Sequence, residues 1–227
     1  IFRIIKFIDM KKIFLPIAII TAFTLGSCGG GENPPETEET SSENSEETCF
    51  YSYSEGSKVQ VRWTAFKTTA KVGVGGQFDQ VNVTAGDKST KITDILETIK
   101  FNIPTSSTNT ANEDRDAKIV KSFFGAMNET DIIIGQVKTA NGDNYSGTCT
   151  FYLTLNNFEK ETTLNYVVDD ATVKLTGEID VDNWGAENAV ASLNEICRAL
   201  HTGEDGESKT WSIVELAIET NLTKDCH

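Results

Sequence analysis

Histidine is scarce in this chain, and the common catalytic and metal-binding motifs are missing from it. The sequence has two histidines and contains no Cys-x-x-Cys, His-Glu-x-x-His or Gly-x-Ser-x-Gly segment. Zinc sites need clustered Cys and His ligands, and the best-known hydrolase sites carry one of these motifs. We therefore expect a protein that is not an enzyme, with no catalytic residues, no metal and no cofactor beyond a bound lipid.

Positive charge is also in short supply. Twenty Lys and Arg residues stand against 34 Asp and Glu residues, which gives a formal net charge of −14. Proteins that bind nucleic acid neutralise its phosphates with clustered basic side chains. The charge balance therefore argues against nucleic acid as a partner, and the length suits one folded domain.

No apolar run is long enough to cross a bilayer, which takes about 20 residues. The main run, residues 13–23, is broken by a proline and a threonine and follows Lys11 and Lys12. A short basic segment before roughly 7–15 apolar residues is typical of a secretory signal peptide. We expect residues 1–27 to be this signal, with Met10 as its start, and the mature protein to be exported.

The segment LGSC, which ends at Cys28, resembles the lipobox of bacterial lipoproteins. In that class the cysteine becomes the new N-terminus and carries acyl chains, so the resemblance implies a membrane anchor. Residues 29–48 follow with seven glutamates and no basic or aromatic residue, a composition that cannot bury a core. We expect residues 28–48 to be a lipidated cysteine with a disordered acidic tether. The anchor would lie on the periplasmic face of the envelope or on the cell surface of a Gram-negative bacterium.

The rest of the chain is dominated by alternation of apolar and polar residues. The clearest run, residues 145–155, reads YSGTCTFYLTL. Such strands have one dry and one wet face, which is the pattern of an antiparallel sheet closed into a barrel or folded as a sandwich. Eight strands are predicted in this way, at residues 59–65, 78–83, 99–103, 132–137, 145–155, 164–168, 172–182 and 214–222.

Two segments have helical spacing instead. Residues 112–125 open with Asn112 as an N-cap and end at a glycine, and residues 186–203 carry an apolar stripe before another glycine. The fold class is therefore all-β with two short helices.

The order of several motifs resembles the YceI-like, polyisoprenoid-binding periplasmic proteins. These motifs, spread over roughly residues 59–222, are VGGQF (74–78), RDAKIVKSFF (115–124), LTLNNFEKETTL (153–164) and IDVDNWG (179–185). The chain departs from the family at Lys118, where a histidine is usual, so no site is inferred there. It also departs at Asn157 and Phe158, where family members tend to have glycine and valine.

The resemblance implies an eight-stranded antiparallel, lipocalin-like β-barrel over residues 49–227. Its lumen would hold a long apolar lipid: a polyisoprenoid, an isoprenoid quinone or a fatty-acyl chain. The protein would be a non-catalytic, membrane-tethered carrier or sequestering protein, and a homodimer is a further expectation because dimers occur in the family. The alternative is a structural or envelope-stress lipoprotein with a filled barrel, since aromatic stripes in strands are more often plain core. The strand faces offer as lumen residues Trp63, Phe101, Tyr145, Phe151, Leu153, Leu155, Tyr166, Leu175 and Ile179.

Four cysteines remain after Cys28, and an even number in an exported domain predicts two disulfides, with free buried thiols as the alternative. In a closed antiparallel barrel the first and last strands are neighbours. Cys49 precedes the first strand and Cys226 ends the last, so this pair is the first choice. Cys149 and Cys197 would then join the barrel to a helix, and a Cys197–Cys226 bond is the second choice.

Overall fold

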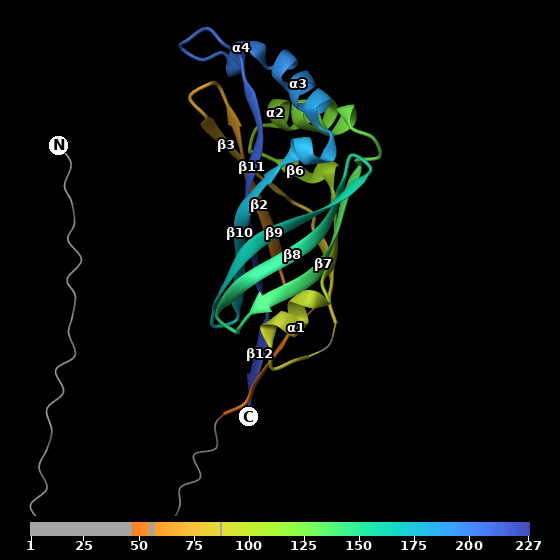
Figure 1. The fold of residues 1–227 in the computed structure, drawn as a ribbon, viewed down its shortest axis with the longest axis vertical. Helices are drawn as coiled ribbons and strands as arrows, with labels where there is room; N and C mark the ends of the chain where they lie inside the picture. The colour runs from red at the N-terminus through yellow and green to blue at the C-terminus, as the bar shows by residue number, and fades with distance from the viewer. Residues whose placement is uncertain (1–46, 55–56, 87) are drawn as a thin grey trace, which may run out of the picture. The chain divides into compact units, whose positions relative to one another are not determined.

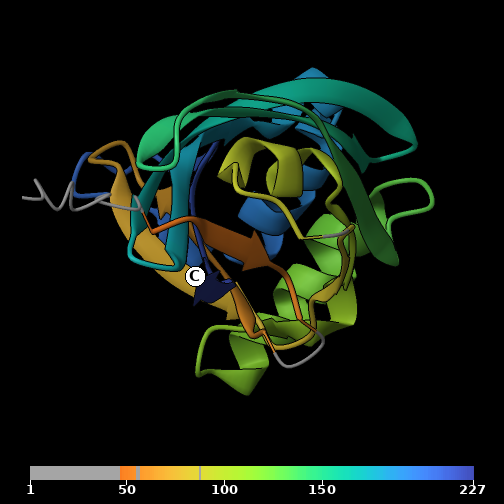
Figure 2. The ribbon, with the colours of Figure 1, turned by 90° about the horizontal axis from the view of Figure 1, so that it is seen from below.

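A strongly curled antiparallel sheet forms most of the described part of the protein (Figures 1 and 2). The computed structural model describes residues 47–54, 57–86 and 88–227. The predicted signal peptide, the lipidation at Cys28 and nearly all of the predicted tether lie outside these residues. Thr48, placed in the tether by the sequence, instead pairs with the C-terminal residue through two backbone hydrogen bonds of 2.9 and 3.1 Å.

Every pair of neighbouring strands in the sheet is antiparallel. The edges are β4 and β6, yet β5 and β6 are consecutive in the chain and are joined by one 3-10 turn, η1 (Thr105–Ser107). The curled sheet therefore returns close to its own starting edge. In spatial order its strands are β4 (Asn82–Thr84), β5 (Lys100–Pro104), β7 (Ile132–Gly142), β8 (Ser146–Leu155), β9 (Phe158–Asp169), β10 (Thr172–Asp180), β11 (Thr210–Asn221), β2 (Val59–Lys67), β3 (Val72–Phe78) and β6 (Thr108–Asn109).

The expected number of eight strands is not confirmed, because the described residues place ten strands in this sheet. The strand predicted over residues 78–83 is divided between the end of β3 and the short β4. The body of β3 reads VGVGGQF, and glycine is unfavourable in strands, so its alternation is hard to recognise. The mostly β character with short helices is confirmed.

Short helices lie at both ends of the curled sheet (Figure 1). Among the described residues, one end has only α1 (Ile92–Glu97), which the sequence analysis missed. The two predicted helices are present at the other end, each broken into shorter pieces, and the Asn112 side chain accepts the expected capping bond from the Arg115 amide at 2.9 Å. The pieces of the first are α2 (Glu113–Lys118), the π-helical turn η2 (Ile119–Phe123) and η3 (Phe124–Ala126), and those of the second are α3 (Glu187–Ile196) and α4 (Arg198–His201). The 3-10 turn η4 (Val181–Trp184) precedes α3 and begins where the sequence predicts the end of a strand.

The core has one apolar cluster toward each end. At the α1 end, Ile92, Ile95 and Leu96 are at most 1% exposed and pack with Cys149 and Tyr166. Each such aliphatic side chain contributes roughly 1.5–3 kcal/mol when fully buried. The second cluster lies at the α3 end and contains Phe124, Leu153, Leu155, Val181, Trp184, Ala186 and Ala189.

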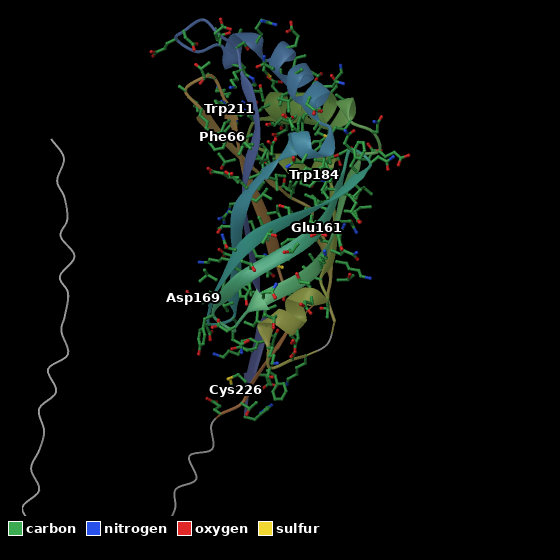
Figure 3. All side chains as sticks on the ribbon, viewed as in Figure 1. Phe66, Glu161, Asp169, Trp184, Trp211 and Cys226 are labelled. Atoms are coloured by element: carbon green, nitrogen blue, oxygen red, sulfur yellow. A yellow bond between two sulfur atoms is a disulfide. The ribbon has the colours of Figure 1, made fainter. Side chains whose placement is uncertain are left out.

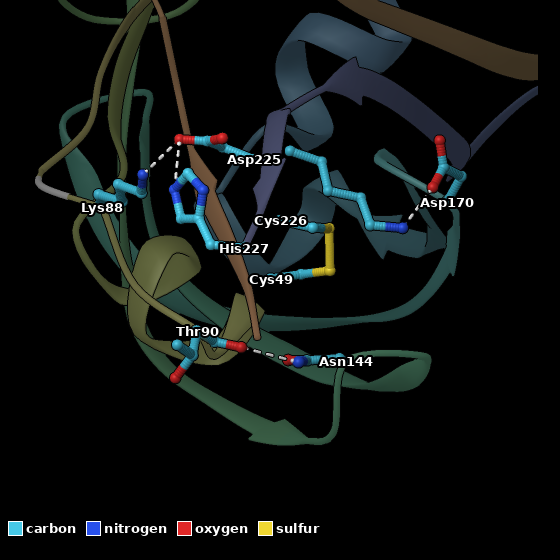
Figure 4. The surroundings of a disulfide bond; sticks show 9 residues. Cys49, Lys88, Thr90, Asn144, Asp170, Asp225, Cys226 and His227 are labelled. Carbon is cyan, nitrogen blue, oxygen red and sulfur yellow. Dashed lines mark hydrogen bonds and ion pairs between the residues drawn. A yellow bond between two sulfur atoms is a disulfide. The ribbon is translucent and has the colours of Figure 1, made fainter. Parts of the chain in front are cut away.

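A two-stranded ribbon of β1 (Cys49–Ser52) and β12 (Thr223–Cys226) lies at the α1 end. The structure contains the Cys49–Cys226 disulfide that the strand order predicts. Figure 4 shows its surroundings, where Lys88 forms an ion pair of 2.7 Å with Asp225 of β12. The ribbon therefore joins both ends of the domain to each other and to the segment before α1.

The second predicted disulfide is wrong. Cys149 and Cys197 are buried free thiols among the residues that the structure describes. Cys149 lies in β8 beneath α1, whereas Cys197 follows α3 at the opposite end of the sheet, so a bond between them is out of reach. The second choice, Cys197–Cys226, is excluded as well because Cys226 is bonded to Cys49.

Candidate functional site

An apolar cavity of about 210 Å³ lies inside the curled sheet. Its lining extends from Leu96 of α1 to Leu193 of α3, so the cavity runs along the sheet between the two helical ends. We call this cavity the lumen. It is the candidate ligand site.

The walls of the lumen are the inner faces of the strands. Trp63 of β2 is opposite Leu216 of β11, and Val61 is opposite Ile218, so both strands present every second residue to the cavity. This period of two follows from the pleat, which sends successive side chains to opposite faces. Inward residues of these two strands and of β8 are Val59, Val61, Trp63, Ala65, Val214, Leu216, Ile218, Thr220, Phe151, Leu153 and Leu155.

Two groups of paired phenylalanines line the lumen. Toward the α3 end, Phe124 stands 6.3 Å from Phe78 and 5.1 Å from Phe123, measured between ring centroids. Further down, Phe101 and Phe151 meet edge to face with centroids 6.2 Å apart. Such pairs add about 0.5–1.5 kcal/mol beyond the area they bury. They hold the lining rings against one another.

One part of the wall is built by η4 in place of a strand pair. β10 pairs with β9 only from Thr172 to Thr176, and beyond this point the two strands separate. Trp184 of η4 packs there with 2% exposure, and its indole nitrogen donates to the Leu153 carbonyl at 2.9 Å. The Asn156 side chain donates to the Trp184 carbonyl at 2.8 Å. These contacts hold η4 in place where β9 and β10 separate, and Figure 3 shows Trp184 at this level.

Seven of the nine residues predicted for the lumen line it: Trp63, Phe101, Phe151, Leu153, Leu155, Leu175 and Ile179. Tyr145 does not, because it precedes β8 in a turn and is 75% exposed. Its amide donates to the Asp143 carboxylate at 2.8 Å, which holds the turn outside the sheet.

Tyr166 faces inward but lies outside the lumen. It is 1% exposed within the α1-end cluster, and its hydroxyl donates to the Asp143 carbonyl at 2.7 Å. It is therefore part of the solid core below the cavity.

The sequence analysis missed much of the lining on β2 and β11 and all of it on α3. Val214, Leu216 and Ile218 alternate clearly and share one face of a predicted strand, so the signal for them was present. Val190 and Leu193 come from the apolar stripe of α3, for which packing on the sheet was the only expectation.

A search against protein-family models matches residues 52–219 to the YceI-like domain. The chain belongs to the YceI-like family. No curated protein matches it at a significant level.

Two of the solved structures that resemble this YceI-like chain in fold share low sequence identity with it. One is a polyisoprenoid-binding domain from Saccharophagus degradans that is implicated in plant cell wall breakdown. It has 13% sequence identity and a TM-score of 0.51, and the match covers 78% of this chain and 99% of that one. The other is BcnA from Burkholderia cenocepacia, with 14% identity, a TM-score of 0.50 and coverage of 73% and 96%. At these identities the likeness concerns the fold alone.

The lumen of this YceI-like domain is nearly free of polar groups. Its polar lining side chains are Tyr53, Trp63, Thr210, Trp211 and Thr220, and no charged side chain of the described residues lines it. A charge placed inside would lack a counter-charge, which is unfavourable in an apolar interior. The lumen is therefore suited to a neutral, apolar guest.

The side chains that could act as a nucleophile or as metal ligands lie outside the lumen of the YceI-like domain. Burial raises the pKa of the Cys149 thiol to about 12, and the negative charge of Glu97 adds to the rise, so this thiol stays neutral and is a poor nucleophile. Glu47 lies beside Cys49 and Cys226, but both sulfurs are committed to the disulfide. No helix in the described ranges combines the length and apolar character needed to cross a membrane.

Proposed function

We propose that this protein is a non-catalytic binding protein whose lumen holds one long apolar lipid, such as a polyisoprenoid, an isoprenoid quinone or a fatty-acyl chain. The observation that carries the proposal is the apolar lumen running between the two helical ends. The fold similarity to a protein described as a polyisoprenoid-binding domain supports it.

The physical basis is the hydrophobic effect. A chain that buries ~500 Å² of apolar surface gains about 12 kcal/mol of transfer free energy, before the cost of ordering it. Since this term does not depend on direction, tight binding needs no elaborate polar site. A lining of aliphatic and aromatic side chains is sufficient.

The test is native mass spectrometry of the purified protein, together with analysis of its organic extract. We expect one lipid bound per chain. Phe151→Trp enlarges an inward side chain and should lower the occupancy, whereas Tyr152→Trp changes the next residue, on the outer face of β8, and should leave it unchanged. An empty protein with equal stability before and after extraction would favour the filled structural lipoprotein instead.

We also propose that the protein is exported and lipid-anchored through Cys28, on the periplasmic face or the cell surface. The basic and apolar segments before the LGSC sequence support this proposal, and the Cys49–Cys226 bond fits an oxidising compartment. Cys28→Ser should move the protein from the membrane fraction to the soluble fraction and remove acyl-chain labelling. A variant that stays in the membrane fraction would contradict the anchor.

A further inference from the structure

Two neighbouring segments of the lumen wall have no backbone ladder between them. They are the described parts of residues 51–61, which contain the start of β2, and of residues 78–89, which contain β4. At one end Val61 is paired with Phe78, and at the other end Tyr51 and Ser89 exchange two backbone hydrogen bonds of 2.7 and 3.0 Å. Between these two pairs, no backbone hydrogen bond joins the two segments among the residues that the structure describes.

Each segment has an unpaired strand edge at this place. β3 ends at Phe78, so Val59 and Gln60 of β2 have a strand partner only on the β11 side. β4 pairs with β5 from Asn82 to Thr84 and has no strand partner on its other side within the described ranges. Side chains therefore have to complete the wall between β2 and β4.

Four side chains line the lumen from these two edges: Tyr53, Val59, Val81 and Val83. We call these four residues the seam. All four are half-buried, so part of each side chain is accessible. The Tyr53 hydroxyl donates to the Ser57 carbonyl at 3.3 Å, which lies in the same segment and does not bridge to β4. Apolar contacts have no preferred direction, so the seam can part and close again without the loss of a ladder bond.

The other place where strands of the wall separate is held differently. Between β9 and β10 the turn η4 fills the space, and its Trp184 side chain is only 2% exposed. The Trp184 indole donates to the Leu153 carbonyl, and Asn156 donates to the Trp184 carbonyl. Opening the wall there requires directional hydrogen bonds to break, whereas opening it at the seam does not.

The two ends of the lumen are also held more firmly than the seam. At the α1 end, Ile92, Ile95 and Leu96 are at most 1% exposed, so a lipid that passed there would disturb the packed core. At the α3 end, Asn194 of α3 accepts a hydrogen bond of 3.1 Å from the Thr210 hydroxyl of β11, which ties the helix to the sheet.

We propose that the seam is the site where the lipid enters and leaves the lumen, with Tyr53 as its largest gating side chain. An apolar chain that passes between β2 and β4 replaces the apolar contacts of the seam with its own, and the strand ladders stay intact. This inference rests on the proposed lipid-binding function and adds the route by which the lipid reaches its site.

The first experiment measures exchange rates with the lipid-free full chain and a fluorescent polyene fatty-acid methyl ester. Stopped-flow fluorescence gives the rate of uptake, and transfer to excess phosphatidylcholine vesicles gives the rate of release. A gate affects both directions alike. We expect Tyr53→Ala to raise both rates by about tenfold, which is about 1.4 kcal/mol off their shared barrier, and to leave the Kd within about threefold.

Leu193→Ala is the matched control, because Leu193 lines the lumen from α3 and not from the seam. It removes contacts with the bound lipid only, so it should raise the release rate and the Kd together and leave uptake unchanged. If Tyr53→Ala behaves in this same way, Tyr53 lines the lumen without gating it, and the inference is overturned.

A second experiment blocks the wall at one place at a time. Val83→Cys, labelled with a bulky maleimide, should slow uptake and release by at least about tenfold. Val72→Cys is the control, since Val72 is 47% exposed and pairs with Lys67, whose ammonium donates to the Leu200 carbonyl of α4 at the opposite end. Its label should leave both rates unchanged, as should the same treatment of the wild type, in which Cys149 and Cys197 are buried.

The outcomes separate the entry site from lipid binding itself. Normal exchange by the labelled Val83→Cys protein, or a block by the label at Val72, would overturn the seam as the entry site while leaving lipid binding intact. Failure of the unlabelled wild type to bind the methyl ester would overturn the proposed function.

Discussion

Gly76 shows how one missing side chain shapes the lumen wall. An added Cβ would meet the Trp63 ring at 2.3 Å, whereas at the neighbouring Gly75 the nearest atom is the Trp63 carbonyl oxygen at 3.9 Å. We expect Gly76→Ala to lower the free energy of unfolding by about 1–3 kcal/mol, the usual effect of overpacking. Gly75→Ala should be neutral or stabilise by up to about 1 kcal/mol, because alanine reduces the freedom of the unfolded chain. Urea denaturation of the pair measures both values, and equal destabilisation would show that the Trp63 ring does not depend on Gly76.

The buried Cys149 thiol makes the free energy of unfolding depend on pH under alkaline conditions. Its pKa is raised from 9.0 to about 12, first by burial and then by the charge of Glu97. Above pH 9 the unfolded chain loses this proton while the folded protein keeps it. The free energy of unfolding should therefore be unaffected below pH 9 and fall from pH 9 to 12, by about 1.4 kcal/mol per pH unit.

Cys149→Ala isolates this effect from the tyrosines, which titrate in the same range. The variant lacks the thiol, so its stability should fall less between pH 8 and pH 10.5 than that of the wild type. We expect the gap between the two proteins to narrow by about 2 kcal/mol over this interval. Urea denaturation at both pH values measures the gap, and a constant gap would mean that the thiol ionises as easily in the folded protein.

At the scale of elements, the β8–β9 hairpin ties the sheet to η4. Its two loop residues, Asn156 and Asn157, have positive φ values of 50° and 60°, as a tight two-residue hairpin turn requires. Asn156 also donates to the carbonyls of Trp184 and Gly185 and accepts from the Asn128 amide. The hairpin therefore holds η4 in place where β9 and β10 separate.

Glycine substitutions separate the two roles, because glycine keeps the positive φ. Asn156→Gly removes three hydrogen bonds and should lower the free energy of unfolding by about 2–4 kcal/mol. Asn157→Gly loses no contact with η4 and should change stability by less than about 0.5 kcal/mol. Thermal and urea denaturation of both variants provide the comparison. Similar losses in both would place the effect in the turn itself and not in the contacts to η4.

The elements that could be predicted are those with one dry and one wet face. β8, β10 and β11 alternate because one side packs inward and the other meets water. The first half of β9 was missed because it separates from β10 and is exposed on both faces. Helix α1 was missed because six residues are too few to establish a helical period, although Ile92, Ile95 and Leu96 have the right spacing.

The candidate site was predictable to the same extent as the strand faces. Every second residue of β8 faces inward, and this rule identifies Phe151, Leu153 and Leu155. Applying it to Tyr145, one residue before the strand begins, produced the error there. The unpaired indole nitrogen of Trp63 could not be predicted, because it depends on which indole nitrogens find a carbonyl after folding, as those of Trp184 and Trp211 do. A sequence pattern records which side chains face inward and not which of them remain unpaired.

At the scale of the whole molecule, one covalent bond joins the two ends of the domain. Cys49 and Cys226 are 177 positions apart, and β1 and β12 add a short antiparallel ribbon around them. A crosslink that closes a long loop restricts the unfolded chain strongly, and native disulfides of this kind typically contribute about 2–5 kcal/mol. Since the ribbon also contacts the segment before α1 through Lys88 and Asp225, the bond supports the α1 end of the domain.

Removing this bond should therefore destabilise the entire domain. We expect the double variant Cys49→Ala/Cys226→Ala to lower the free energy of unfolding by about 2–5 kcal/mol in urea denaturation, with a single cooperative transition retained. A reductant should destabilise the wild type by a similar amount, because the two ends are then free to separate. The double variant is the control for the reductant: Cys149 and Cys197 are free thiols among the described residues, so it should show no response. A reductant that weakens the double variant as much as the wild type would show that the Cys49–Cys226 bond does not stabilise the domain.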